Sequence, residues 1–229
     1  MFQVNQLSGF GVGEQGPALP SKVFNGTTID DTNLTTYTFA GQDIGDADIG
    51  RLVVVALFFT AATSRTVSSV TINGVSATQV VTNSDGTGGI FRRSSIYQAV
   101  VPTGTTGVSI GVTLSGAAQA CGLSSWSIYD LNSTTAVDSD SAFGAAPTVT
   151  LPSMNTSDAG VVVANCGFLV SSSATQSWTG GVTEQSDLEV DNIVMSAADG
   201  GTTGATVAPS STLSGGGIAY GIAVGASYR

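Results

Sequence analysis

Short runs of strand-forming residues, separated by turn residues at intervals of roughly 8–12 positions, constrain this chain more than any other feature. Residues 51–60 contain the continuous apolar stretch Leu52–Phe59, which has the length of a buried central strand. Residues 70–77 alternate around Asn73-Gly74, a pair that favours a type I′ hairpin turn. No window combines helical periodicity with a cap. We therefore predict an all-β fold, an antiparallel β-sandwich of jelly-roll-like form.

Further strands are predicted wherever β-branched and aromatic residues recur between turns. These segments are 35–39, 95–101, 108–114, 123–131, 149–151, 160–169, 193–197 and 218–224. The glycine-rich segment 85–89 is predicted to be a loop. Because sandwiches of this length often form one unit, we predict a single β-sandwich domain over residues 23–229.

Residues 1–22 differ from the rest, because glycine and proline interrupt them too often for a regular element. We predict an extended N-terminal arm. Four apolar side chains of the arm are candidates for docking on a neighbouring molecule: Phe2, Val4, Leu7 and Phe10. The alternative is a segment that folds back on its own domain.

The chain contains no histidine, and its basic residues are one lysine, Lys22, and five arginines. Histidine is the commonest general base and metal ligand, and without it the many serine and threonine hydroxyls lack the usual activating partner. The glycine-rich segments also lack the lysine of a phosphate-binding loop. We predict that the protein is not an enzyme and uses no cofactor.

The net charge is -10 and the isoelectric point is near 4.1. Such a chain repels nucleic acid and anionic membranes, so neither is predicted as a partner. The longest apolar stretch is too short to span a bilayer, and residues 1–20 lack the basic and apolar regions of a secretory signal. We expect synthesis in a cytoplasm.

The densest acidic cluster is Asp43, Asp46 and Asp48. Calcium prefers several hard oxygen ligands from one loop, but this spacing does not match an EF-hand and no bidentate glutamate follows. The alternative is a solvated loop with Asx turns, in which each carboxylate accepts from a nearby backbone amide. We predict no metal site.

A glycoside hydrolase needs two carboxylates that face each other across a sugar. The available acids are Asp138 and Asp140, together with Glu184, Asp187, Glu189 and Asp191. The spacing of the last three is typical of the solvated face of a strand. We keep a carbohydrate-active enzyme only as a contrast to the binding hypotheses.

Cys121 and Cys166 lie in apolar strand-like contexts. Free buried thiols are expected in a chain made in the cytoplasm, although one disulfide between neighbouring strands would be the alternative. The only basic doublet, Arg92-Arg93, either recognises an acidic partner or faces solvent at a strand entry. Among the aromatic residues, Trp178 is the better candidate for a surface ring that stacks on a glycan, whereas Trp126 has core spacing.

Four segments carry a resemblance to a known class of proteins: 1–11 (MFQVNQLSGFG), 37–45 (YTFAGQDIG), 51–56 (RLVVVA) and 67–75 (VSSVTINGV). They resemble small virion-associated structural proteins of tailed bacteriophages. With the strands that follow, the resemblance covers most of the chain. It implies a place on the head or tail of the particle and assigns a role to no individual residue.

The leading prediction is a virion head decoration or cement protein that binds the capsid exterior through its arm. The alternative is a tail or fibre component that contacts a receptor or glycan on the host surface. The expected partners are capsid or tail proteins of the same particle and further copies of this chain in a homo-oligomer.

Overall fold

The computed structural model describes residues 18–145, 147–156, 160–190, 192–202, 206–215, 217 and 220–229. Apart from one 3-10 turn at Thr87–Gly89, every regular element in these residues is a strand. The strands of the N-terminal half are β1 (Ser21–Asp30), β2 (Leu34–Gln42), β3 (Leu52–Ala61), β4 (Val67–Ile72), β5 (Val75–Ser76), β6 (Thr78–Asp85), β7 (Phe91–Val100), β8 (Val108–Ala118) and β9 (Ala120–Tyr129). Those of the C-terminal half are β10 (Asp138–Ala145), β11 (Thr148–Thr150), β12 (Met154–Asn155), β13 (Val161–Leu169), β14 (Ala174–Thr179), β15 (Thr183–Val190), β16 (Ile193–Gly201), β17 (Thr206–Val207), β18 (Ser210–Gly215) and β19 (Tyr220–Tyr228).

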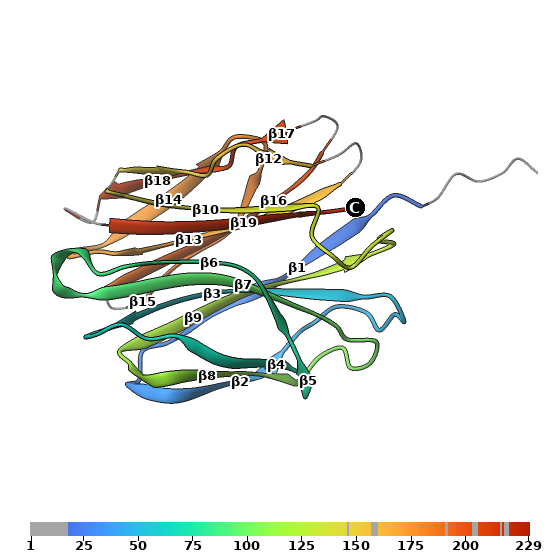
Figure 1. Cartoon of the computed structure of the whole chain (residues 1–229), viewed down its shortest axis with the longest axis horizontal. Coiled ribbons are helices and arrows are strands. Elements are labelled where there is room, and N and C mark those ends of the chain that lie inside the picture. The colour runs from blue at the N-terminus through green and yellow to red at the C-terminus, as the bar shows by residue number, and fades with distance from the viewer. Residues whose placement is uncertain are drawn as a thin grey trace, which may run out of the picture.

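The strands form two sandwiches that follow each other along the chain (Figure 1). In the first, the five-stranded sheet β1-β9-β3-β7-β6 packs on the four-stranded sheet β2-β8-β4-β5. In the second, the five-stranded sheet β10-β19-β13-β16-β15 packs on the smaller sheets β11-β18-β14 and β12-β17. All the strand pairs are antiparallel, so the predicted all-β antiparallel sandwich architecture is confirmed. The jelly-roll-like form stays a prediction.

The two halves repeat one topology. Reading β1, β9, β3, β7 and β6 as β10, β19, β13, β16 and β15 turns the first five-stranded sheet into the second, and β2-β8-β4 likewise becomes β11-β18-β14. The two five-stranded sheets face each other with β1 against β15, β3 against β13 and β6 against β10. This reversed order is that of a twofold axis running along the strands, as in an isologous dimer interface.

A continuous apolar layer joins the sandwiches. Leu52 and Trp126 of the first sheet pack with Val161 and Tyr228 of the second. Residues 23–229 therefore hold two sandwiches, whereas one was predicted from the sequence. The two sandwiches share this buried layer, which is compatible with one domain. The single domain over residues 23–229 stays a prediction.

The centre of this layer depends on a pairing of a large residue with a small one. Phe58 of β3 is completely buried, and its ring fills the place that a side chain at Gly167 of β13 would occupy. If Leu52 is aligned with Val161 at the start of the two central strands, Phe58 and Gly167 occupy equivalent positions in the repeat. The equivalent positions have thus become sterically complementary.

The strand ends define two ends of the molecule. Ser21, Leu52 and Tyr228 lie at one, which we call the terminal end because the last residue, Arg229, also lies there. Asp30, Thr60 and Leu169 lie at the other, which we call the cleft end for the site described below. The two ends are therefore separate surfaces of the molecule.

Local expectations can be compared directly with the backbone. Asn73 and Gly74 have φ values of 49° and 80°, so the predicted type I′ hairpin between β4 and β5 is confirmed. In the segment 85–89, predicted to be a loop, Asp85 is the last residue of β6 and Thr87–Gly89 form the 3-10 turn. Residues 1–17 of the predicted arm lie outside the described residues, and Ser21 and Lys22, predicted to be its last two residues, belong to β1. No helix in the described part of the chain is long and apolar enough to cross a bilayer.

Candidate functional site

Of the five residues predicted to contact partners, the structure describes only Trp178. Phe2, Val4, Leu7 and Phe10 lie outside the described part of the chain. The expectation that Trp178 presents its ring at the surface is wrong: only 8% of the residue is exposed, and it packs in the core of the second sandwich. Its indole Nε1 donates to Ser196 Oγ at 2.8 Å, so its polar edge is also satisfied internally. Alternation in β14 explains the error, because Ala174 and Gln176 point inward with it.

The acidic loop of Asp43, Asp46 and Asp48 contains the predicted Asx turns. Asp43 and Asp48 accept from the backbone amides of Gly45 and Gly50, each at 2.7 Å. No group of three or more metal-ligating side chains occurs among the residues that the structure covers.

Backbone carbonyls of this loop instead accept hydrogen bonds from the side chain of Arg51. Arg51 is completely buried, and its guanidinium donates to five backbone carbonyls at 2.7–3.0 Å. The acceptors are Gly45, Asp46, Val101, Thr103 and Gly104. A buried charge is tolerated only where such partners surround it. Arg51 therefore ties two loops of the terminal end together.

The remaining acids are spread over several structural roles. Asp138 and Asp140 lie on β10 and accept from the amides of the residues that follow them. In β15, Asp187 and Glu189 accept from backbone amides of β14, so they also link two sheets. Burial raises the pKa of Asp187, and the hydrogen bond that it accepts from the backbone amide of Gln176 opposes this shift. Asp191 lies outside the described residues.

Both cysteines are free and buried, as expected. Cys121 packs in the core of the first sandwich and Cys166 in that of the second, so the two are not disulfide partners. Burial raises the pKa of both thiols well above the usual value, which opposes a nucleophilic role.

A cleft of about 670 Å³ opens at the cleft end, between the two five-stranded sheets. One wall of the cleft belongs to the first sandwich and contains Arg92, Thr60 and Ala120, which are register partners across β7, β3 and β9. The facing wall belongs to the second sandwich and contains Ile193, Leu169 and Tyr220, which are register partners across β16, β13 and β19. The alignment that pairs Phe58 with Gly167 makes these two triplets equivalent. The cleft therefore lies where the pseudo-twofold axis leaves the molecule.

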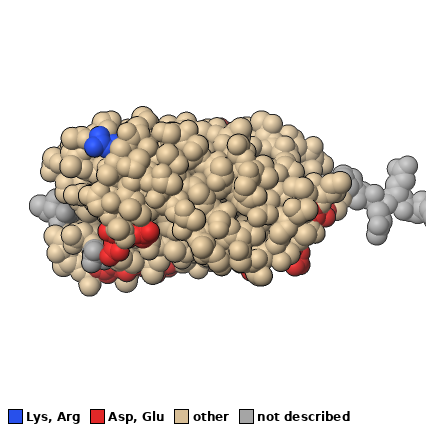
Figure 2. Space-filling model, turned by 90° about the horizontal axis from the view of Figure 1, so that it is seen from below, with Lys and Arg blue, Asp and Glu red and all other residues tan. Residues whose placement is uncertain are grey.

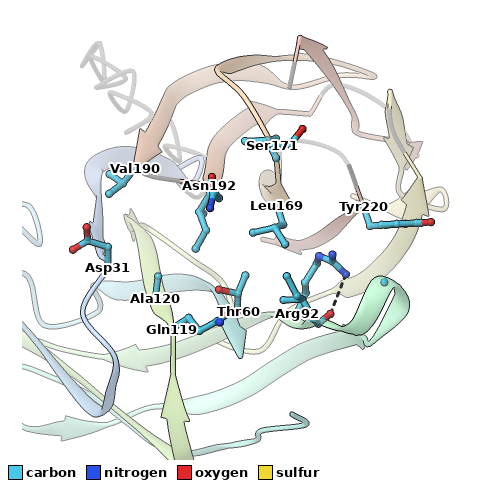
Figure 3. A pocket seen from close by; sticks show the side chains of 14 residues that line it. Asp31, Thr60, Arg92, Gln119, Ala120, Leu169, Ser171, Val190, Asn192 and Tyr220 are labelled. Carbon is cyan, nitrogen blue, oxygen red and sulfur yellow. Dashed lines mark hydrogen bonds between the residues drawn. The ribbon is translucent and has the colours of Figure 1, made fainter. Parts of the chain in front are cut away.

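Although the two triplets occupy equivalent positions, their chemistry differs. Arg92 and Tyr220 are in contact, with the guanidinium carbon 5.4 Å from the ring centre. On the side of the cleft away from this contact, Ala120 of the first wall lies near Ile193 of the second, and both are buried. The polar residues Asp31, Gln119 and Asn192 line the cleft on this second side (Figure 3). Sequence reasoning did not group any of these residues.

Arg92 is 3% exposed, so the expectation that Arg92-Arg93 is a solvent-facing pair is wrong for this residue. All of its hydrogen bonds within the described residues use Nη1, which donates to the Asp85 carboxylate at 3.3 Å and to two carbonyls of the turn before β7. Nε is buried and has no acceptor among these residues. Burial lowers the pKa of Arg92, and the neighbouring Asp85 offsets part of that shift. Arg93, by contrast, donates to Arg65 O and Thr82 Oγ1.

The single lysine links the two sandwiches. Lys22 of β1 forms an ion pair with Asp199 of β16, whose carboxylate also accepts from Trp126 Nε1 at 3.1 Å and from Gln185 Nε2 at 3.2 Å. Asp199 is 2% exposed, so it depends on these partners.

Replacing Lys22 with methionine is expected to lower the free energy of unfolding by about 2 kcal/mol, because a buried carboxylate then loses its cation. Chemical denaturation measures this change. Asp199→Leu alone and the double variant complete a thermodynamic cycle, in which we expect the double variant to lose less than the sum of the single losses. Strictly additive losses would contradict a direct coupling between the two side chains.

Buried tyrosines predict the response to alkaline pH. Burial raises the pKa of Tyr37 to about 12, and it also raises the pKa values of Tyr97 and Tyr228. Above the ordinary value of 10, the unfolded chain loses protons that the folded chain retains, so stability falls as the pH rises. We expect denaturation midpoints to decline above that pH, with tyrosinate absorbance appearing together with unfolding. Tyrosinate absorbance of all the tyrosines at an ordinary pKa in the folded protein would contradict this prediction.

Comparisons of this chain with protein-family models, curated proteins and solved structures find no match.

Proposed function

We propose that the protein is a structural component of a phage particle that attaches to the capsid exterior as a head decoration. The proposal rests on the resemblance of four segments to virion-associated proteins and on the layout of the terminal end. Leu19, just before β1, is 68% exposed. At the same end, Val75 and Val100 line a small hollow of about 200 Å³. Exposed apolar side chains at the end of the molecule where residues 1–17 join the fold favour docking of this end on another protein.

The outer face of the first sandwich supports the same proposal. Figure 2 views the molecule from the side of the sheet β2-β8-β4-β5, and few charged side chains appear there. In β2, the exposed residues Thr36, Thr38 and Ala40 alternate with buried ones. Since the cores of protein interfaces are depleted in charge, such a face can lie against a neighbouring subunit at a low desolvation cost.

The test uses particles assembled without this protein. Full-length protein and a variant lacking residues 1–17 are added, and bound protein is measured by co-sedimentation and located by immunogold labelling. Deletion stops at residue 17 because Lys22 is needed for the ion pair with Asp199. We expect the full-length protein to label heads, and the truncated protein to remain unbound with an unchanged unfolding midpoint. Equal binding of both would exclude attachment through the arm, and labelling of tails alone would exclude decoration of the head.

A tail or fibre component that contacts the host is the second candidate, and the cleft is the observation that favours it. Its position opposite the terminal end would leave it accessible if the terminal end were anchored to a particle. Isolated protein should then coat host cells, and cells pretreated to remove surface glycans should bind less. No coating at saturating protein concentration would contradict this candidate.

A further inference from the structure

We propose that the cleft between the two sandwiches binds a carboxylate-bearing sugar, with the carboxylate on Arg92 and the hydroxyl groups on the side formed by Asp31, Gln119 and Asn192. This inference does not rest on attachment to a capsid. It concerns the opposite end of the molecule, and its test uses the isolated protein.

The first argument is the arrangement of the arginine donors. The carboxylate of Asp85 and the carbonyls of Thr87 and Ile90 occupy Nη1 alone. Nε and Nη2 form the edge of a guanidinium that can hold a carboxylate through two parallel hydrogen bonds. In the described part of the chain neither atom has an acceptor, although Nε is buried. A buried unsatisfied donor on a 3% exposed arginine calls for a partner.

The second argument is that the guanidinium is held in place before any ligand arrives. The guanidinium lies over the ring of Tyr220, and Phe143 stacks on the same tyrosine with ring centres 5.9 Å apart. Figure 3 shows Arg92 pointing from its strand toward Leu169 and Tyr220. A charged group held in this way loses little conformational entropy on binding.

The third argument is the size and composition of the cleft. About 670 Å³ is far more than a bare carboxylate fills, and it falls in the range of small-molecule sites. Leu169 and Ile193 supply an apolar surface for the C–H face of a sugar ring. Asp31, Gln119 and Asn192 offer acceptors and donors on the side of the cleft away from Arg92 (Figure 3). One carboxylate and several hydroxyls on a compact ring match this distribution, and the net charge of -10 disfavours highly charged anions.

The binding experiment compares three probes on the full chain: glucuronate, glucose and acetate. Glucose lacks the carboxylate, and acetate lacks the ring. Titrations are followed by calorimetry and by the arginine Nε–H signals in nitrogen-15 NMR spectra. We expect glucuronate to shift the Arg92 signal and to bind at least about tenfold more tightly than either control, the loss expected for one charge-assisted hydrogen bond. Equal binding of acetate or of glucose would overturn the proposal, as would no binding of glucuronate.

Variants test the two sides of the cleft separately. Arg92→Lys keeps the charge but loses the two-donor edge, and we expect glucuronate affinity to fall about tenfold or more. Arg93→Lys is the matched control and should bind as the parent does. Because Arg92 also ties down a turn, Leu169→Trp provides an independent variant that fills the cleft and leaves the arginine in place. Unchanged glucuronate binding in Leu169→Trp would place the ligand elsewhere and overturn the proposal.

Asp31→Ala examines the hydroxyl side. Asp31 is exposed and its carboxylate has no hydrogen bond or ion pair among the described residues, so its loss should leave the fold intact. We expect weaker glucuronate binding with no change for acetate. Unchanged glucuronate binding would show that the ring does not reach this side, and the assignment of a sugar would fail.

Discussion

Replacing Arg51 with methionine is expected to lower the free energy of unfolding by about 4 kcal/mol, among the largest single effects available in this chain. Methionine fills much of the same volume but donates no hydrogen bond. Five backbone carbonyls, two of them from residues 45–46, would lose their donor; the bonds to Val101 O are buried and the other four are partly buried. Denaturation followed by tryptophan fluorescence measures the change, since Trp126 and Trp178 are each buried in a core cluster.

Two further substitutions separate charge from geometry at Arg51. Arg51→Lys keeps the positive charge, but a single ammonium cannot reach carbonyls that a planar guanidinium contacts on several sides. We expect it to recover less than half of the loss. Arg65→Met is the matched control, because within the described residues the Arg65 guanidinium donates only two longer bonds, at 3.2 and 3.3 Å, and its loss should cost under about 1 kcal/mol. Equal losses for Arg51→Met and Arg65→Met would contradict a special role for Arg51.

Replacing Gly167 with alanine is expected to cost about 3 kcal/mol, because the new methyl group would overlap the buried ring of Phe58. That ring belongs to the facing sheet and is enclosed, so relief requires the two sandwiches to move apart. Chemical denaturation measures the loss. Gly201→Ala in the neighbouring strand is the control, since nothing lies within 4 Å of the place its methyl group would take.

A compensating change sharpens this prediction. Phe58→Leu removes the ring that Gly167→Ala would strike, and alone it should destabilise the protein by leaving space in the core. The double variant Phe58→Leu with Gly167→Ala should be more stable than the sum of the two single losses predicts. Strict additivity, or an equal loss from Gly201→Ala, would contradict the steric account of the interface.

Local sequence signals predicted the parts of the fold that depend on neighbouring residues. The apolar run Leu52–Phe59 identified β3, which is buried on both faces because sheets cover it from both sides. Asn73-Gly74 identified its hairpin because two successive positive φ values suit few other residue pairs. Edge strands were less apparent. Strand β6 is mostly half-buried, and so its residues show no clear alternation.

Long-range pairing was beyond such signals. Arg92 and Tyr220 come from different halves of the chain, and their contact depends on how the two sheets face each other. The doublet Arg92-Arg93 marked Arg92 as a candidate, but no local sequence signal indicated that the Arg92 side chain is buried. For Trp178, the adjoining Gly180-Gly181 suggested a surface position, whereas the alternation of β14 directs its ring inward. The topological repeat was not apparent either, because equivalent residues such as Phe58 and Gly167 differ so strongly in size.

The covalent connection between the sandwiches has a genetic consequence. In a homodimer of one such sandwich, every mutation would appear on both sides of the twofold axis, so a large residue facing itself at the centre would clash and a small one would leave a void. Within one chain each half can mutate independently. That freedom is required for the pairing of Phe58 with Gly167 and for the two unlike triplets around the cleft. A symmetric pair of sandwiches would present an arginine on both sides of its axis, whereas this chain presents Arg92 on one side and Ile193 at the equivalent position.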